Sequence, residues 1–122
     1  MITHIVGVTY KNKKYNVNRQ DIIKNLCGQE KIFLRREYKN RFDKNAVAVM
    51  LGGDNPQRIG YVKAELAGFL AEYWNDWKFF AKIKEIRDGD PKANKPYGMS
   101  ITVTKSKRRD NRKIYKEKKK RE

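Results

Sequence analysis

Residues 36–49 read Arg36-Glu37-Tyr38-Lys39-Asn40-Arg41-Phe42-Asp43-Lys44-Asn45-Ala46-Val47-Ala48-Val49, a dense polar turn that leads into an alternating Ala/Val strand. A turn that only reverses the chain needs little more than a glycine or an asparagine. This turn adds cations suited to phosphate, aromatic rings suited to bases, and a carboxylate that can accept a hydrogen bond from a hydroxyl group. The alternative interpretation is a solvated turn in which Asp43 and Asn45 cap their own backbone. The turn alone leaves both interpretations open.

Short strands are predicted on both sides of this turn. Residues 31–36 precede it, residues 46–51 follow it, and the Gly-Gly-Asp-Asn-Pro sequence of residues 52–56 then predicts a hairpin turn. The chain would return as a fourth strand over residues 57–62. A helix is predicted from residue 63 to residue 75, because its apolar residues recur at helical spacing and would face the core. These residues are Leu66, Phe69, Leu70, Tyr73, Trp74 and Trp77.

The N-terminal part of the chain predicts one strand and one short helix. Residues 2–10 are rich in β-branched and aromatic residues, with Gly7 as a bend or a bulge in the middle. After a polar connection, Asn18 is the expected N-cap of a helix that ends at Gly28. Cys27 is expected to pack behind that helix as a small hydrophobic residue.

The C-terminal part predicts two further strands and a tail. Residues 78–86 alternate well enough for a fifth strand, with Lys82 and Lys84 on its outward face. A polar loop separates it from a sixth strand over residues 97–104. Beyond this point periodicity disappears, so residues 105–122 are predicted to be a basic tail that is disordered or marginally helical.

The predicted element order is β-α-β-β-β-α-β-β. Because the strands are short, are joined mostly by tight turns and have only two helices to cover them, they close most easily into a small antiparallel barrel. Gly60 in the fourth strand suggests a bulge. The predicted fold class is mostly β (α+β), with six antiparallel strands and two flanking helices. The barrel domain spans residues 1–104, and the tail spans residues 105–122.

The chain is strongly basic. Its 122 residues carry a net charge of +16, and half of this excess lies in residues 105–122, which hold 11 lysines and arginines against 3 acidic residues. Such a charge indicates nucleic acid, an anionic membrane or a ribosome-like assembly as the partner. No apolar run reaches the length of a transmembrane helix, and residues 1–4 do not begin a secretory signal. We therefore expect a cytoplasmic protein that binds nucleic acid and no membrane.

Neither a cofactor nor catalysis is expected. The single Cys27 and the single His4 exclude an internal disulfide and a Cys/His zinc site. The sequence holds no Ser-His-Asp arrangement and no phosphate-cradling Gly-Lys-Ser/Thr loop. Acidic side chains could bind Mg²⁺ for phosphodiester cleavage, but they are spread over a turn, a hairpin and a helix. They are Glu37, Asp43, Asp54 and Glu65.

Several short motifs occur in an order and spacing that resemble a HIRAN domain. They are Val6-Gly7-Val8-Thr9-Tyr10, Asn18-Arg19-Gln20, Leu34-Arg35-Arg36-Glu37, Phe42-Asp43-Lys44-Asn45-Ala46-Val47-Ala48-Val49, Ile59-Gly60-Tyr61-Val62 and Glu65-Leu66-Ala67. The resemblance implies a modified OB-like barrel. That family occurs alone in bacteria and phages, which is the type this chain resembles, or fused to helicases and nucleases. In eukaryotic fork-remodelling helicases it recognises the 3′ end of single-stranded DNA.

The resemblance also implies a binding pocket. Tyr10 and Phe42 match base-stacking aromatic residues of the family. Asp43 matches an aspartate that contacts the terminal nucleotide and its free 3′-hydroxyl group, and Tyr61 stands where the helicases have a histidine. Phosphate contacts would come from cations nearby, namely Arg36, Lys39, Arg41 and Lys63.

Two positions depart from the helicase pattern and leave 3′-end selection open. Thr9 stands in place of a phosphate-binding arginine, and Lys11 in place of a second aromatic residue. The predicted function is single-stranded DNA binding without catalysis, in a process such as DNA repair or replication. RNA is an alternative target, because stacking on single strands tolerates either sugar. A second alternative is an adaptor that binds a protein such as a helicase or a nuclease, with the basic tail incidental. In the nucleic-acid interpretations the tail adds salt-sensitive, nonspecific affinity.

Overall fold

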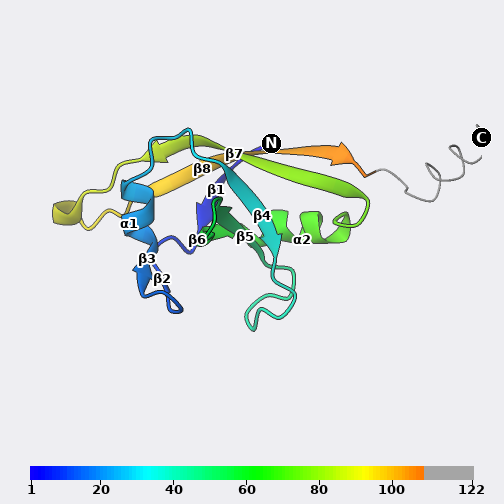
Figure 1. The fold of residues 1–122 in the computed structure, drawn as a ribbon, viewed down its shortest axis with the longest axis horizontal. Coiled ribbons are helices and arrows are strands. Elements are labelled where there is room, and N and C mark those ends of the chain that lie inside the picture. Colours follow the sequence, from blue (N-terminus) through cyan, green and yellow to red (C-terminus); the bar gives the residue numbers. More distant parts are fainter. Residues whose placement is uncertain (109–122) are drawn as a thin grey trace, which may run out of the picture.

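Six strands form one antiparallel sheet in the computed structural model, which describes residues 1–108 (Figure 1). They are β1 (Ile2–Val6), β4 (Ile32–Arg36), β5 (Val47–Leu51), β6 (Gln57–Val62), β7 (Trp77–Arg87) and β8 (Gly98–Lys107). Neighbouring strands follow the order β4-β5-β6-β1-β8-β7. Lys31, just before β4, also bridges Lys82 of β7, which brings the two edges of the sheet together. The result is a nearly closed, mostly β barrel, so the predicted fold class is confirmed.

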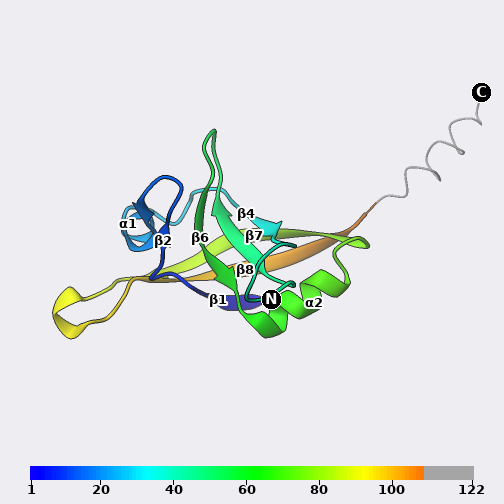
Figure 2. The same cartoon turned by 90° about the horizontal axis from the view of Figure 1, so that it is seen from below.

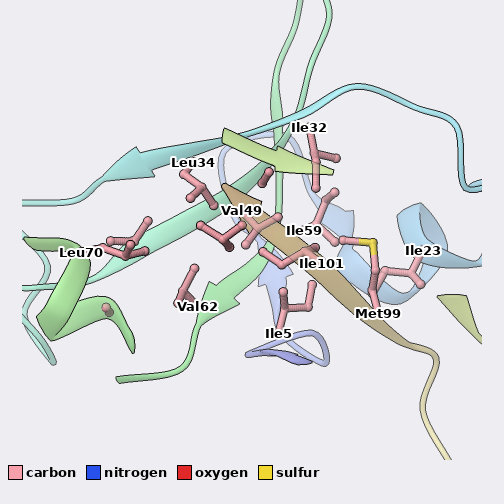
Figure 3. Packing of buried hydrophobic residues seen from close by; sticks show 14 residues of the cluster. Ile5, Ile23, Ile32, Leu34, Val49, Ile59, Val62, Leu70, Met99 and Ile101 are labelled. Carbon is pink, nitrogen blue, oxygen red and sulfur yellow. The ribbon is translucent and has the colours of Figure 1, made fainter. Parts of the chain in front are cut away.

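Two helices cover the core of this barrel. Figure 3 shows that α1 (Arg19–Lys24) and α2 (Ala64–Glu72) reach the core from opposite ends, through Ile23 and Leu70 respectively. Both side chains are almost fully buried, and burial of each contributes about 1.5–3 kcal/mol relative to exposure. Inward-facing strand residues fill the space between them, among them Ile5, Val49, Ile59, Val62, Met99 and Ile101.

The strands β6 and β1 approach each other closely at Gly60. A Cβ atom at this position would lie 2.6 Å from the carbonyl oxygen of Val6. No side chain fits at that separation, so this part of the sheet requires glycine. The register between β5 and β6 also shifts here, because Val49 pairs with Gly60 and Met50 pairs with Arg58. This irregularity agrees with the predicted bulge.

The first strand is shorter than predicted. β1 ends at Val6 because Gly7 has a φ of +69°, which lies outside the strand region. The polar connection that follows contains an unpredicted hairpin of β2 (Lys11–Asn12) and β3 (Val17–Asn18). Strands of two residues are too short to show an alternating pattern.

The start of α1 was predicted correctly, and its end was not. Asn18 is the N-cap, and its side chain accepts a 2.9 Å hydrogen bond from the backbone N–H of Gln20. The helix ends at Lys24, so Gly28 is not its C′ residue. The prediction for Cys27 was wrong as well, because this residue is exposed.

The apolar stripe predicted for α2 only partly faces the core. Three of its residues pack there, namely Leu66, Leu70 and Trp74. Phe69 and Tyr73 are instead exposed and pack on each other, with ring centroids 5.0 Å apart. The helix ends at Glu72, and Trp77 lies in β7.

The last strand is longer than predicted. β8 continues beyond Thr104 because residues 105–107 pair with residues 77–79 of β7. The loop between these strands contains the short 3-10 helix η1 (Pro91–Ala93). The remainder of the predicted tail, residues 109–122, lies outside the described residues. Within residues 1–108, no helix combines the length and the apolar character that a membrane span requires.

Candidate nucleic-acid interface

A buried arginine organises one part of the interface. Arg19 opens α1 and is only 6% exposed. Its Nε donates a 3.0 Å hydrogen bond to Asn12 Oδ1, and its Nη1 donates a 2.7 Å bond to the carbonyl oxygen of Gly7. Its guanidinium carbon lies 5.5 Å from the ring centroid of Tyr61 and 6.0 Å from that of Tyr10. One fixed cation therefore positions both tyrosine rings.

Gly7 makes this cluster sterically possible. A Cβ atom there would lie 3.2 Å from the ring of Tyr61 and 3.6 Å from Nη1 of Arg19. Its positive φ is also strained for any other residue. The backbone can therefore pass close to both side chains only as glycine.

A second group of contacts is centred on the carboxylate of Glu37. The hydroxyl group of Tyr61 donates a 2.7 Å hydrogen bond to Oε1, and Asn40 Nδ2 donates one of 3.2 Å to the same atom. Arg58 donates to Oε2 from Nε at 2.9 Å and also from Nη2. Nη2 of Arg35 lies 3.5 Å from Oε2. Such a charge-assisted network fixes both arginines and the tyrosine.

The network determines the protonation states of its members. Burial alone would raise the pKa of the Glu37 carboxyl group, but hydrogen bonds from Tyr61, Arg58 and Asn40 outweigh burial and lower this pKa overall. Burial and the hydrogen bond to Glu37 raise the pKa of Tyr61. At neutral pH the pair therefore consists of a carboxylate and a neutral phenol.

The strand register explains why these side chains meet. Arg35 of β4 pairs with Ala48 of β5, Ala48 pairs with Tyr61 of β6, and Tyr61 pairs with Val6 of β1. The four residues form one row across the sheet, and their side chains share a face. Since Ala48 is small, Arg35 and Tyr61 can reach toward each other across it.

The loop between β4 and β5 is held largely by its own side chains. Asn40 Oδ1 accepts hydrogen bonds from the backbone N–H groups of Phe42 at 2.9 Å and Asp43 at 3.1 Å. Asp43 Oδ1 accepts a 2.9 Å bond from the backbone N–H of Asn45. The capping role considered for Asp43 therefore exists. The same geometry leaves the Phe42 side chain 98% exposed.

The four predicted phosphate contacts differ in their surroundings. Lys39, Arg41 and Lys63 are exposed. Arg36 instead lies over the ring of Tyr38, with its guanidinium carbon 4.5 Å from the ring centroid. Its Nε and Nη1 atoms are buried and have no hydrogen-bond partner among the described residues.

The structure thus brings part of the predicted site together. Tyr10 and Tyr61 meet at Arg19, whereas Phe42 and Asp43 lie in the loop that Asn40 connects to Glu37. In Figure 1 this loop and the β2–β3 hairpin project from the same side of the barrel. Residues 1–108 contain no group of three or more His, Cys, Asp or Glu side chains that could hold a metal ion.

No role in nucleic-acid binding was predicted for Arg19, Glu37 or Arg58, although each is central to the geometry. One signal was present at Arg19. A cation in the first turn of a helix interacts unfavourably with the positive end of the helix dipole. An arginine immediately after the N-cap therefore indicates that its side chain makes a contact outside the helix. No comparable local signal marks Arg58, because its partner Glu37 is distant in the chain.

Comparisons with known proteins identify the family and the fold of the chain. The family model described as HIRAN domain matches residues 1–106. Helicase-like transcription factor from Oryctolagus cuniculus is 32% identical over 111 residues, and its Homo sapiens counterpart is 31% identical. In both cases the match covers 90% of this chain but only 9% of the relative.

Two solved structures are also similar. The crystal structure of the HIRAN domain of human HLTF matches with a TM-score of 0.58 and 25% identity, over 93% of this chain and 80% of that one. A Lactobacillus plantarum protein matches with a TM-score of 0.54 and 16% identity, over 84% and 90% of the two chains. The second match supports the fold alone.

Proposed function

Since this chain belongs to the HIRAN domain family, we propose that it is a non-catalytic module that binds single-stranded DNA. The observation that carries the proposal is the pair of tyrosines held by Arg19 beside a loop that exposes Phe42. Tyr10 is 67% exposed, so its ring is available to a base. Stacking of one base on an aromatic ring contributes about 1–3 kcal/mol.

The electrostatics around these rings suit a polyanion. Lys39 and Arg41 precede Phe42 on the β4–β5 loop, and Lys63 follows β6 at the start of α2. With a net charge of +16 on the chain, phosphate contacts would add affinity that depends on salt.

The free 3′ end is the proposed target within the strand. Of the two carboxylate oxygens of Asp43, only Oδ1 accepts a hydrogen bond within residues 1–108, from the backbone N–H of Asn45. Oδ2 can therefore accept a hydrogen bond from a terminal hydroxyl group, which an internal phosphodiester lacks. Because Thr9 and Lys11 stand in place of an arginine and an aromatic residue of the helicase pattern, fewer contacts would select the 3′ end over internal nucleotides.

A larger protein partner is proposed for the module. The curated relatives carry the name helicase-like transcription factor, and this chain spans only 9% of their length. We expect the module to deliver single-stranded DNA to a helicase or a nuclease, joined to it covalently or by association.

The test compares strands that differ only at the end. Binding of DNA with a 3′-hydroxyl group, DNA with a 3′-phosphate, circular single-stranded DNA and RNA of the same sequence is measured at low and moderate salt. The proposal expects tightest binding to the 3′-hydroxyl strand and loss of that preference in Asp43→Ala. Equal binding to all DNA forms would remove end recognition. Preference for RNA would change the target, and absence of binding would favour a protein adaptor.

A further inference from the structure

A concave surface lies beside the proposed site, between the β2–β3 hairpin and the β5–β6 hairpin. Figure 2 shows the two hairpins projecting next to each other from the barrel. The groove between them has a volume of about 350 Å³, within the range of small-ligand sites of about 300–1,000 Å³. We define this surface as the hairpin groove.

The hairpin groove is lined by cations and by no acidic residue. Lys13 and Lys14 come from the β2–β3 hairpin, Arg35 from β4 and Arg58 from β6. Neither lysine forms an ion pair with any residue of the described chain, whereas both arginines contact Glu37. Four cations around one groove attract a polyanion more strongly than scattered surface charges do, since concave walls focus the field.

The groove also offers partners for a base and a sugar. Tyr15 lines one wall and is 48% exposed. Side-chain amides of Asn55 and Gln57 lie on the opposite wall, and each amide carries both a donor and an acceptor. This combination of basic, aromatic and amide groups is typical of single-strand binding grooves.

The walls of the hairpin groove are fixed by the proposed site itself. Asn12 Nδ2 donates a 2.7 Å hydrogen bond to the carbonyl oxygen of Arg58, which ties the β2–β3 hairpin to β6. The other side-chain atom, Asn12 Oδ1, accepts the bond from Arg19 that positions Tyr10 and Tyr61. Arg58 belongs to both surfaces, because it lines the groove and its guanidinium carbon lies 5.6 Å from the Tyr61 ring centroid. The hairpin groove therefore adjoins the aromatic surface, by which we mean the rings of Tyr10, Phe42 and Tyr61.

We infer that the hairpin groove is a second subsite, which holds the phosphodiester backbone of the same strand beyond the nucleotides stacked on Tyr10 and Tyr61. Lys13 and Lys14 contact phosphates as point charges, and Arg35 and Arg58 do so through the guanidinium N–H groups that Glu37 does not engage. The inference rests on the proposed function. Affinity is then expected to rise with strand length, because a longer strand also occupies the hairpin groove.

The experiment measures binding of the full chain to oligothymidylates of about three and about ten nucleotides, over a range of salt concentrations. Lys13→Ala/Lys14→Ala is compared with Lys78→Ala/Lys84→Ala, which removes the same charge from exposed positions on β7. In the groove variant, affinity for the long strand should fall by about tenfold and the salt slope by about 1.4, since each phosphate contact accounts for about 0.7. Affinity for the short strand should change by less than about twofold, and the β7 variant should match the wild type for both strands. Thermal unfolding of each variant checks that the fold is retained.

Three outcomes would overturn the inference. In the first, the groove variant binds the long strand with the affinity and the salt slope of the wild type. In the second, the groove variant loses as much affinity for the short strand as for the long one. In the third, the β7 variant loses as much affinity for the long strand as the groove variant does. The proposed function survives these outcomes if Tyr10→Ala still weakens binding of both strands. A wild-type chain that binds neither strand overturns the proposed function and the inference together.

Discussion

The hydroxyl group of Tyr61 donates a 2.7 Å hydrogen bond to Glu37 Oε1, which ties the end of β6 to the residue that follows β4. Glu37 also holds Asn40, and Asn40 Oδ1 holds the backbone N–H groups of Phe42 and Asp43. A continuous chain of hydrogen bonds therefore runs from Tyr61 to the loop that would contact the strand end. Such preorganisation lowers the cost of ordering the site on binding.

Tyr61→Phe tests the contribution of this hydrogen bond. The variant keeps the ring but removes the donor to a charged acceptor, so the free energy of unfolding should fall by about 1.5–3 kcal/mol. Affinity for single-stranded DNA should fall by less than about tenfold, because the ring can still stack. Urea unfolding and equilibrium binding measure the two effects. Tyr38→Phe, at an exposed tyrosine in the β4–β5 loop, is the matched control and should leave both values unchanged.

The lowered pKa of Glu37 predicts a loss of stability in acid. A carboxyl group whose folded pKa lies below its unfolded value of about 4.5 stabilises the fold fully above that value. This stabilisation is lost as the pH falls through the folded pKa. Between neutral pH and acid, the wild type should therefore lose more unfolding free energy than Glu37→Gln. Urea titrations at both pH values measure the difference, and parallel losses in the two proteins would refute the prediction.

Arg19→Lys tests the buried arginine while keeping its charge. A single ammonium group cannot reproduce the fork that bonds to Asn12 Oδ1 and to the carbonyl oxygen of Gly7. A buried acceptor left without a partner costs about 1–3 kcal/mol, so the unfolding free energy should fall by that amount. DNA affinity should fall as well, because Tyr10 and Tyr61 lose their fixed support. Lys24→Ala, at an exposed position at the end of the same helix, should shift stability by less than about 0.5 kcal/mol.

Phe42→Ala separates binding from folding. The side chain is 98% exposed, so the unfolding free energy should change by less than about 0.5 kcal/mol. Loss of one stacked base would lower DNA affinity by about tenfold or more. Phe80→Ala removes a half-exposed phenylalanine from β7 and should leave affinity unchanged. Equal effects of the two substitutions would mean that Phe42 has no special place in binding.

Local patterns in the sequence predicted the parts of the fold that depend on neighbouring residues. The Ala/Val alternation that leads into β5, the N-cap at Asn18 and the irregularity at Gly60 all appear in the structure. The β2–β3 hairpin was missed because its two-residue strands carry no periodic signal. The apolar stripe predicted for α2 was too long, because the helix ends at Glu72. It was also too broad, because periodicity alone does not show that Phe69 faces solvent.

The candidate site was harder to predict than the fold, for a physical reason. Arg58 and Glu37 lie 21 positions apart, and their contact exists only because β4, β5 and β6 align in register. Arg19 likewise contacts Gly7, Asn12 and Tyr61, which belong to three segments that only the folded chain brings together. The family resemblance supplied Tyr10, Phe42, Asp43 and Tyr61, while the residues that hold them required the three-dimensional arrangement.

The most direct test of the account is the affinity of the full chain for a short oligothymidylate at about 200 mM salt, where phosphate contacts alone are weakened. The comparison is between the wild type and Tyr10→Ala/Phe42→Ala. We expect the wild type to retain measurable binding, and the double variant to lose at least about tenfold in affinity with an unchanged salt slope. Equal affinity of the two proteins would contradict it, because binding would then depend on charge and not on the aromatic surface.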